Sequence, residues 1–145
     1  IAHWPAVIAP SGVSPQLCMT MDWSATMLEL GAATWPQDHR PDGVSLLPVL
    51  HDPQHTFERP LYWRMKHRGQ RAYRAGVHKY LRVDGNDYLF NLAQDERERA
   101  NLGSRQPQLL EQMRAQYEQW EASMPPIPDD ASVNLGYGIK DMPQR

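Results

Sequence analysis

The residues with the clearest chemical potential are cations gathered between positions 64 and 71. They are Arg64, Lys66, His67, Arg68 and Arg71, on both sides of Gly69. An arginine guanidinium can grip an oxyanion through two parallel hydrogen bonds, so such a run is suited to an anionic ligand. The competing interpretation is a solvated hairpin tip, whose charges prevent edge-to-edge pairing of a sheet. The residues alone favour this second interpretation.

The other reactive side chains do not form a catalytic set. Cys18 lies between apolar neighbours and has no nearby base to lower its pKa, so it is predicted to be a buried small hydrophobe. Among the six histidines, His51 and His55 are four residues apart, but Pro53 between them argues against a helix that would present both to a metal. We therefore predict no catalytic residue and no metal ligand in this sequence.

Composition excludes several classes of protein. The chain has 145 residues, of which 41% are hydrophobic and 22% charged, so we expect a folded core and not a disordered chain. The net charge of -2 and the absence of long basic runs argue against nucleic acid as a partner. No apolar stretch approaches the roughly 18 to 20 residues that cross a bilayer, so no membrane partner is expected. The compartment, periplasm or cytoplasm, stays open.

The first part of the chain is predicted to be mostly helical. Residues 1–8 indicate a short strand, and the abrupt start at Ile1 suggests a piece of a larger fold. A helix is expected over 20–30, with Thr20 or Asp22 as its cap and apolar residues on all sides, as for a helix buried against several elements. A turn or two of helix, capped by Asp42, is expected over 44–50.

The second part is predicted to be a small antiparallel sheet packed by a helix. Four strands are expected, at 61–66, 71–74, 79–83 and 88–90. A capping box at Asp95 and Glu98 indicates a short helical turn. The last helix is expected over 107–123, with one apolar stripe formed by Leu109, Met113, Tyr117, Trp120 and Met124. This gives an α+β chain divided into 1–55, 56–124 and an extended tail, 125–145.

Six blocks in this order carry a family resemblance. They are Trp4 to Ile8, Met21 to Leu28 with the form Asp-x-x-x-Thr-x-Leu, Pro41 to Pro48, Arg59 to Arg64, Arg71 to Tyr80, and Leu89 to Leu92 followed by Asp95-x-x-Glu98-x-x-Asn101-Leu102. Together they resemble the C-terminal half of type I sulfatases of the alkaline-phosphatase superfamily. The resemblance implies that residues 1–55 end the catalytic α/β domain, and that residues 56–124 form the family's C-terminal subdomain.

The resemblance also implies a parent protein that hydrolyses sulfate esters. Its nucleophile would be a formylglycine hydrate made from Cys or Ser in a Cys/Ser-x-Pro/Ala-x-Arg motif, beside a calcium ion. The segment from Cys18 to Asp22 lacks the Pro or Ala and the Arg of that motif, so Cys18 does not take the nucleophile's role. The calcium ligands and the sulfate-binding Lys and His of the family precede the matching stretch. The partner implied is the N-terminal catalytic part of the same protein.

The resemblance gives the cationic run a functional interpretation. Arg64, His67 and Arg68 become the substrate-binding candidates, at the rim of a pocket for a sulfate ester. Two alternatives stay open, namely a noncatalytic domain that binds a partner, and a fragment of a related phosphodiesterase or phosphonate monoester hydrolase. A homo-oligomer in which the proline-rich tail reaches a neighbouring subunit is as plausible as a free tail.

Overall fold

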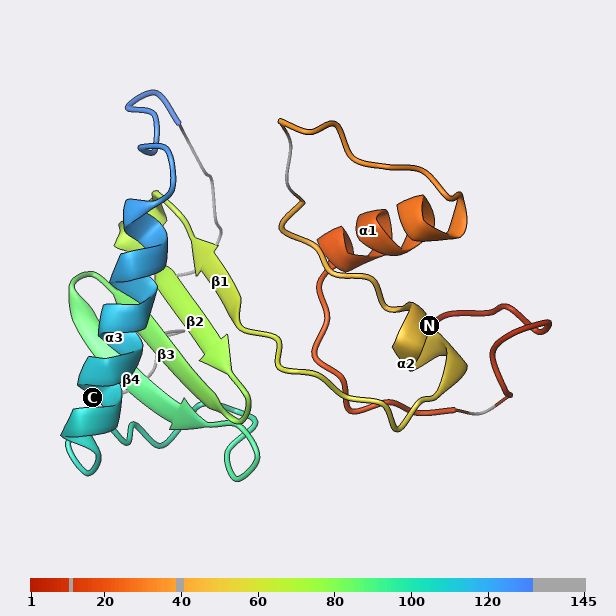
Figure 1. Cartoon of the computed structure of the whole chain (residues 1–145). Coiled ribbons are helices and arrows are strands. Elements are labelled where there is room, and N and C mark those ends of the chain that lie inside the picture. Colours follow the sequence, from red (N-terminus) through yellow and green to blue (C-terminus); the bar gives the residue numbers. More distant parts are fainter. Residues whose placement is uncertain (11, 39–40, 132–145) are drawn as a thin grey trace. The chain divides into compact units, whose positions relative to one another are not determined.

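The protein folds as two compact units. The structure, a computed structural model, describes residues 1–10, 12–38 and 41–131. The first unit is Ile1–Arg59 and the second begins at Pro60 (Figure 1). In the described residues no helix is long and apolar enough to cross a membrane.

The first unit contains two helices, α1 (Thr20–Leu30) and α2 (Leu47–His51), joined by long loops. The strand expected over residues 1–8 is wrong. The amides of Val7 and Ile8 both donate to the carbonyl of Trp4, at 2.9 and 2.8 Å, so the segment turns back on itself. Such a turn uses backbone groups that a strand would offer to a neighbour.

Helix α1 has the predicted bounds but a different cap. Its N-cap residue is Met19, and Asp22, one turn inside the helix, accepts the Met19 amide at 2.7 Å. The expected cap at Asp42 is also wrong, because α2 begins at Leu47 after Leu46. Asp22 thus serves the start of α1 from inside the helix, whereas Asp42 offers its backbone carbonyl to Arg59.

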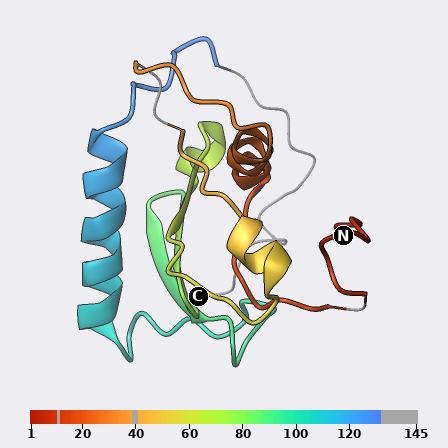
Figure 2. The ribbon, with the colours of Figure 1, turned by 45° about the vertical axis from the view of Figure 1, so that its right-hand side comes forward.

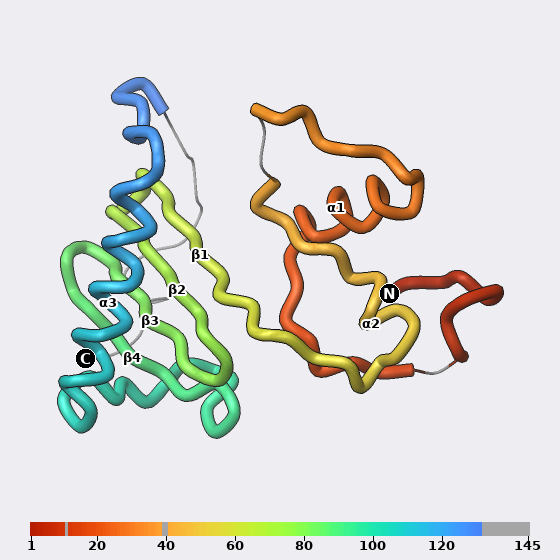
Figure 3. Tube along the Cα trace, viewed as in Figure 1, coloured from red at the N-terminus to blue at the C-terminus, as the bar shows by residue number. Residues whose placement is uncertain are grey.

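The second unit is built on a four-stranded antiparallel sheet in the order β1-β2-β3-β4, as predicted (Figure 3). The strands are β1 (Leu61–Arg64), β2 (Arg71–Ala75), β3 (His78–Val83) and β4 (Asn86–Asn91). Asp84 and Gly85 join β3 to β4 with φ angles of 49° and 76°. Two successive left-handed residues match the right-handed twist of a hairpin, and Asp-Gly tolerates them.

Helix α3 (Pro107–Ala122) lies along one face of this sheet (Figure 2). Its predicted apolar stripe is confirmed, since Met113 and Tyr117 are 3% and 1% exposed. They form one core cluster with Tyr73, Tyr80 and Leu89. Proline at the first helical position suits the start of α3, because its missing N–H would have had no partner there.

The segment between β4 and α3 is held by side chains and contains no helix. Asp95 accepts the Ala100 amide at 2.8 Å, and Glu98 accepts two hydrogen bonds from the Lys79 ammonium, at 2.6 and 2.8 Å. The capping box expected from Asp95 and Glu98 is therefore wrong. Glu98, with φ of 55°, leaves the helical region and turns its carboxylate to the sheet.

Candidate functional site

The cationic run forms a tight loop between β1 and β2, and a single 3-10 turn, η1 (His67–Gly69), makes its tip. The Met65 amide closes the base of the loop by donating to the Gln70 carbonyl at 2.9 Å. Arg68 and Gly69 are both left-handed, with φ of 54° and 57°. Glycine adopts this conformation freely, whereas Arg68 must be held in it by its neighbours.

The Arg71 side chain closes this loop from inside. Its Nη1 donates to the carbonyls of Met65 and Gln70, at 3.0 and 2.9 Å. Its Nε lies 2.6 Å from Glu121 Oε1 on α3. Arg71 therefore fixes the shape of the loop and ties it to the end of the helix.

Three arginines stand side by side across the sheet at this end. Arg64 is paired with Arg71, and Arg71 with Arg82, directly across neighbouring strands. Like charges in direct cross-strand pairs repel each other. Glu121 beside Arg71 and Asp87, 3.6 Å from Arg82, offset that repulsion.

The three substrate-binding candidates lie within this structure but have different surroundings. Arg64 Nη2 donates to the Pro125 carbonyl at 2.6 Å, and Arg68 Nε donates to Asp84 Oδ2 at 2.9 Å. His67 is half-buried at the start of η1. The hydrogen bond from Arg68 lowers the pKa of the Asp84 carboxyl, so that carboxyl stays ionised and offsets the charge of Arg68.

A cavity of about 140 Å³ lies beside the loop. Its lining is Gly69, Arg71, Tyr80, Arg82, Tyr117, Glu118 and Glu121. Two arginines face two glutamates there, so its charge favours neither anion nor cation. Burial raises the pKa of Tyr117, which keeps that hydroxyl protonated.

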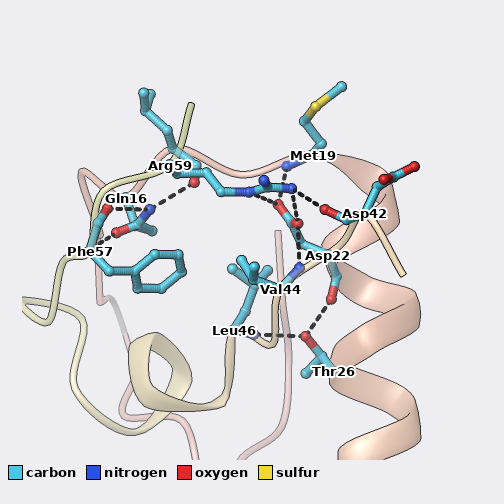
Figure 4. A network of polar contacts seen from close by, with 10 residues as sticks. Gln16, Met19, Asp22, Thr26, Asp42, Val44, Leu46, Phe57 and Arg59 are labelled. Atoms are coloured by element: carbon cyan, nitrogen blue, oxygen red, sulfur yellow. Dashed lines mark hydrogen bonds and ion pairs between the residues drawn. The ribbon is translucent and has the colours of Figure 1, made fainter. Parts of the chain in front are cut away.

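A second polar site, in the first unit, surrounds the fully buried Asp22 (Figure 4). Its Oδ1 accepts from Arg59 Nη2 at 2.6 Å and from the Val44 amide at 3.0 Å. Thr26 extends the network, donating to the Asp22 carbonyl at 2.6 Å and accepting the Leu46 amide at 2.9 Å. One turn of α1 thus anchors the loop before α2 and the end of the unit.

The same site depends on close approach of the backbone at Gly43. A Cβ added there would lie 2.2 Å from the carbonyl oxygen of Met21, well inside van der Waals contact. Only glycine lets this loop reach the first turn of α1, where Val44 meets Asp22. Sequence reasoning missed this site, since Asp22 and Arg59 are 37 residues apart and nothing local links them.

The ionisation of Asp22 makes this site sensitive to acid. Burial raises the pKa of its carboxyl, but the Arg59 guanidinium and the amides of Val44 and Met19 outweigh burial, and the pKa falls below 3.8. Because the pKa of Asp22 is lower in the folded than in the unfolded protein, the full stabilisation by its carboxylate is present at pH values above the unfolded pKa. It is lost as the pH falls through the folded value.

We therefore expect the urea midpoint of the first unit to fall as the pH is lowered from 4 to 2. Asp22→Asn removes the titrating carboxyl, so the variant should start less stable and lose less over the same range. Urea titration of both proteins at each pH, with the protection of the α1 amides from exchange as the probe, is the measurement. Equal pH dependence in the two proteins would contradict the assignment to Asp22.

Cys18 is exposed, so the expectation of a buried cysteine is wrong. Its apolar neighbours did not predict burial, because a loop and not a regular element carries it. Over residues 1–10, 12–38 and 41–131, no three His, Cys, Asp or Glu side chains are grouped so as to hold a metal ion.

Comparison with known proteins points to one family. A scan against protein-family models found no match. The chain is 40% identical over 63 residues to N-acetylgalactosamine-6-sulfatase of Rattus norvegicus, a match that covers 43% of this chain and 12% of the relative. The chain thus spans only a small part of that relative.

Solved structures show the same fold over most of the chain. The putative sulfatase yidJ from Bacteroides fragilis matches with a TM-score of 0.63 and 21% identity, over 82% of this chain and 28% of that one. A protein solved with its substrate D-glucosamine-2-N,6-O-disulfate matches with a TM-score of 0.64 and 18% identity, over 83% and 28%. The antiparallel sheet with its packed helix is thus a fold that this chain shares with these solved structures. In sequence and in fold, the chain is similar to the C-terminal part of sulfatases.

Proposed function

We propose that this chain completes a sulfuric ester hydrolase, in which it stabilises the catalytic domain and shapes the rim of the substrate pocket. The observation that carries the proposal is the joint match to sulfatases, 40% identical over 63 residues in sequence and extending over about four-fifths of the chain in fold. The relatives just described suggest a sulfated amino sugar as the substrate class.

The proposal assigns the bond-breaking chemistry to the part of the parent protein that precedes this chain. Sulfate-ester cleavage in this family needs an activated gem-diol nucleophile and a cation that polarises the sulfuryl oxygens. The formylglycine motif is absent from the 145 residues. The formylglycine and the calcium ion therefore belong, in this proposal, to the preceding catalytic part.

The surface of α1 supports packing against that catalytic part. Met21, Met27 and Leu30 on this helix are 37%, 57% and 40% exposed. Three large apolar side chains spread around an 11-residue helix are costly to leave in water, and they suit a helix that is buried on more than one side. The same surface would also serve the alternative of a noncatalytic domain that binds a separate partner. The sulfatase match favours packing against the catalytic part.

The rim role of the loop rests on its fixed shape and its positive charge. Arg71 closes the loop, and Asp84 holds Arg68 at its tip. Cations held in place before the substrate arrives bind it without the entropy cost of ordering flexible side chains. Arg64, His67 and Arg68 remain the proposed substrate contacts.

We expect Arg68→Ala in the parent protein to raise the KM for an aryl sulfate by about tenfold to a hundredfold, the loss of one hydrogen bond to an anion. Arg68→Ala also removes an ion pair with Asp84, so Asp84→Asn is the matched control. It breaks the same pair but keeps the guanidinium for the substrate. Arg99→Ala, an exposed arginine outside the loop, should leave KM unchanged.

The kinetics separate three outcomes. A raised KM for Arg68→Ala with a normal KM for Asp84→Asn supports substrate contact. Equal effects of both variants would show a purely structural pair. Turnover of a phosphonate monoester or phosphate diester, with none of any sulfate ester, would contradict the hydrolase assignment itself.

A further inference from the structure

The segment that follows α3 lies against the cationic loop. We call residues 125–131 the strap. Arg64 Nη2 donates to the carbonyl of Pro125 at 2.6 Å. The Lys66 ammonium donates to the carbonyl of Pro128 at 3.4 Å and also to that of Asp129. Two cations of the loop are thus occupied by the backbone of the same chain.

Among the described residues, few other contacts hold the strap. Prolines at 125, 126 and 128 lack the N–H that would join a neighbouring strand. Its turn is closed by the Ala131 amide, which donates to the Pro128 carbonyl at 3.1 Å. The side chains are exposed except at Ile127 and Ala131, which are half-buried. A segment with so little buried surface opens at low free-energy cost.

The acceptors of the strap are weaker than those of a sulfate ester. Both kinds of bond have an ionised donor, but the oxygens of a sulfate monoester also carry negative charge, which adds a Coulomb attraction that a neutral carbonyl oxygen lacks. The contact with the Asp129 carbonyl also brings a carboxylate residue next to Lys66, where it opposes an incoming anion. The strap and an anionic ligand therefore compete for Arg64 and Lys66.

We propose that the strap covers Arg64 and Lys66 of the cationic loop, and that a sulfated ligand must displace the strap before it can bind these two side chains. In this role we call the strap the guard of the loop. This inference rests on the rim role proposed above and adds its regulation. It also assigns a ligand-binding role to Lys66. A protein that lacks the strap should bind anionic esters more tightly than one that keeps it.

Two truncations of the parent protein test the guard. A chain ending at Met124 lacks the strap, whereas a chain ending at Ala131 keeps it. The first should show a KM for an aryl sulfate about threefold to tenfold lower than the second, with similar kcat. Adding Lys66→Met to the shorter chain should reverse that gain. Equal KM values in the two truncations would overturn the proposal.

A second measurement reports on the strap without any activity. In the 145-residue chain with Cys18→Ser, Asp129→Cys provides a single thiol for a fluorophore and leaves the carbonyl bound by Lys66 in place. Inorganic sulfate, or Lys66→Met, should lower the fluorescence anisotropy as the strap is released. Sodium chloride at matched ionic strength is the control for screening.

The two measurements test the proposed function and the guard separately. If the parent protein hydrolyses no sulfate ester but sulfate still releases the label, the proposed function fails and the guard stands as an anion-sensitive strap. If neither sulfate nor Lys66→Met changes the anisotropy, the guard is overturned, whatever the parent's activity.

Discussion

Replacing Arg59 by alanine should lower the free energy of unfolding of the first unit by about 3 kcal/mol. The guanidinium is 11% exposed and faces a carboxylate that has no exposed surface. Removing it leaves Asp22 charged, buried and short of one partner. We expect the lower end of the range for a broken buried ion pair, because the amides of Met19 and Val44 still donate to Asp22.

Hydrogen exchange of the α1 amides measures this loss, since a change of about 3 kcal/mol speeds exchange more than a hundredfold. Glu29→Ala on the same helix is the matched control. Its side chain is exposed, so its effect should stay within about 0.5 kcal/mol. Exchange rates in Arg59→Ala equal to those of the control would show that the pair does not hold α1.

A double-mutant cycle separates the ion pair from the network around it. Asp22→Ala also orphans the amides of Met19 and Val44, so it should cost more than Arg59→Ala. Once Asp22 is absent, adding Arg59→Ala should cost much less than it does alone. Additive effects would mean that Arg59 acts through its bond to the Asp42 carbonyl and not through Asp22.

The regular elements could be predicted because their signals are local. The apolar stripe of α3 repeats every three or four residues, and Met113 and Tyr117 within it are buried as expected. The hairpin at Asp84 and Gly85 is encoded in two adjacent residues. Each of these patterns fits within one element, so it does not depend on distant partners.

The polar contacts could not be predicted because they join distant residues. The sequence predicted Asp22 as a cap for α1, yet its carboxylate also binds Arg59, 37 residues away. The sequence predicted Glu98 as half of a capping box, yet it pairs with Lys79 on β3. A carboxylate near a helix start is compatible with several roles. Only the fold decides which donor reaches it.

The candidate site shows the same division. The sequence located the cationic loop correctly between two strands, because strand alternation and Gly69 frame it. It did not show that Arg68 meets Asp84 or that Arg64 meets Pro125, at separations of 16 and 61 residues. The sequence was enough to predict where these charged side chains lie. The groups that they bind could be identified only from the structure.

The largest effect we expect is on catalysis. This chain by itself, with calcium, should not hydrolyse an aryl sulfate above the uncatalysed rate, while the longer protein that includes the preceding part should. Sulfatase chemistry depends on a nucleophile and a cation acting together, and enzymes of this kind accelerate reactions by about a millionfold or more. The cations of the loop supply neither function, because an arginine can bind a sulfuryl oxygen but cannot attack the sulfur.

Release of the phenol from an aryl sulfate, followed in both proteins under the same conditions, is the measurement. Mixing the isolated chain with the separately produced preceding part is the sharper version, because activity recovered only in the mixture would show that the two parts form one site. The apolar side chains of Met21 and Met27 give such a mixture a surface on which to associate. Turnover by the isolated chain that survives chelation of calcium would contradict our placing of the chemistry, and would turn attention to Cys18 and the cationic loop.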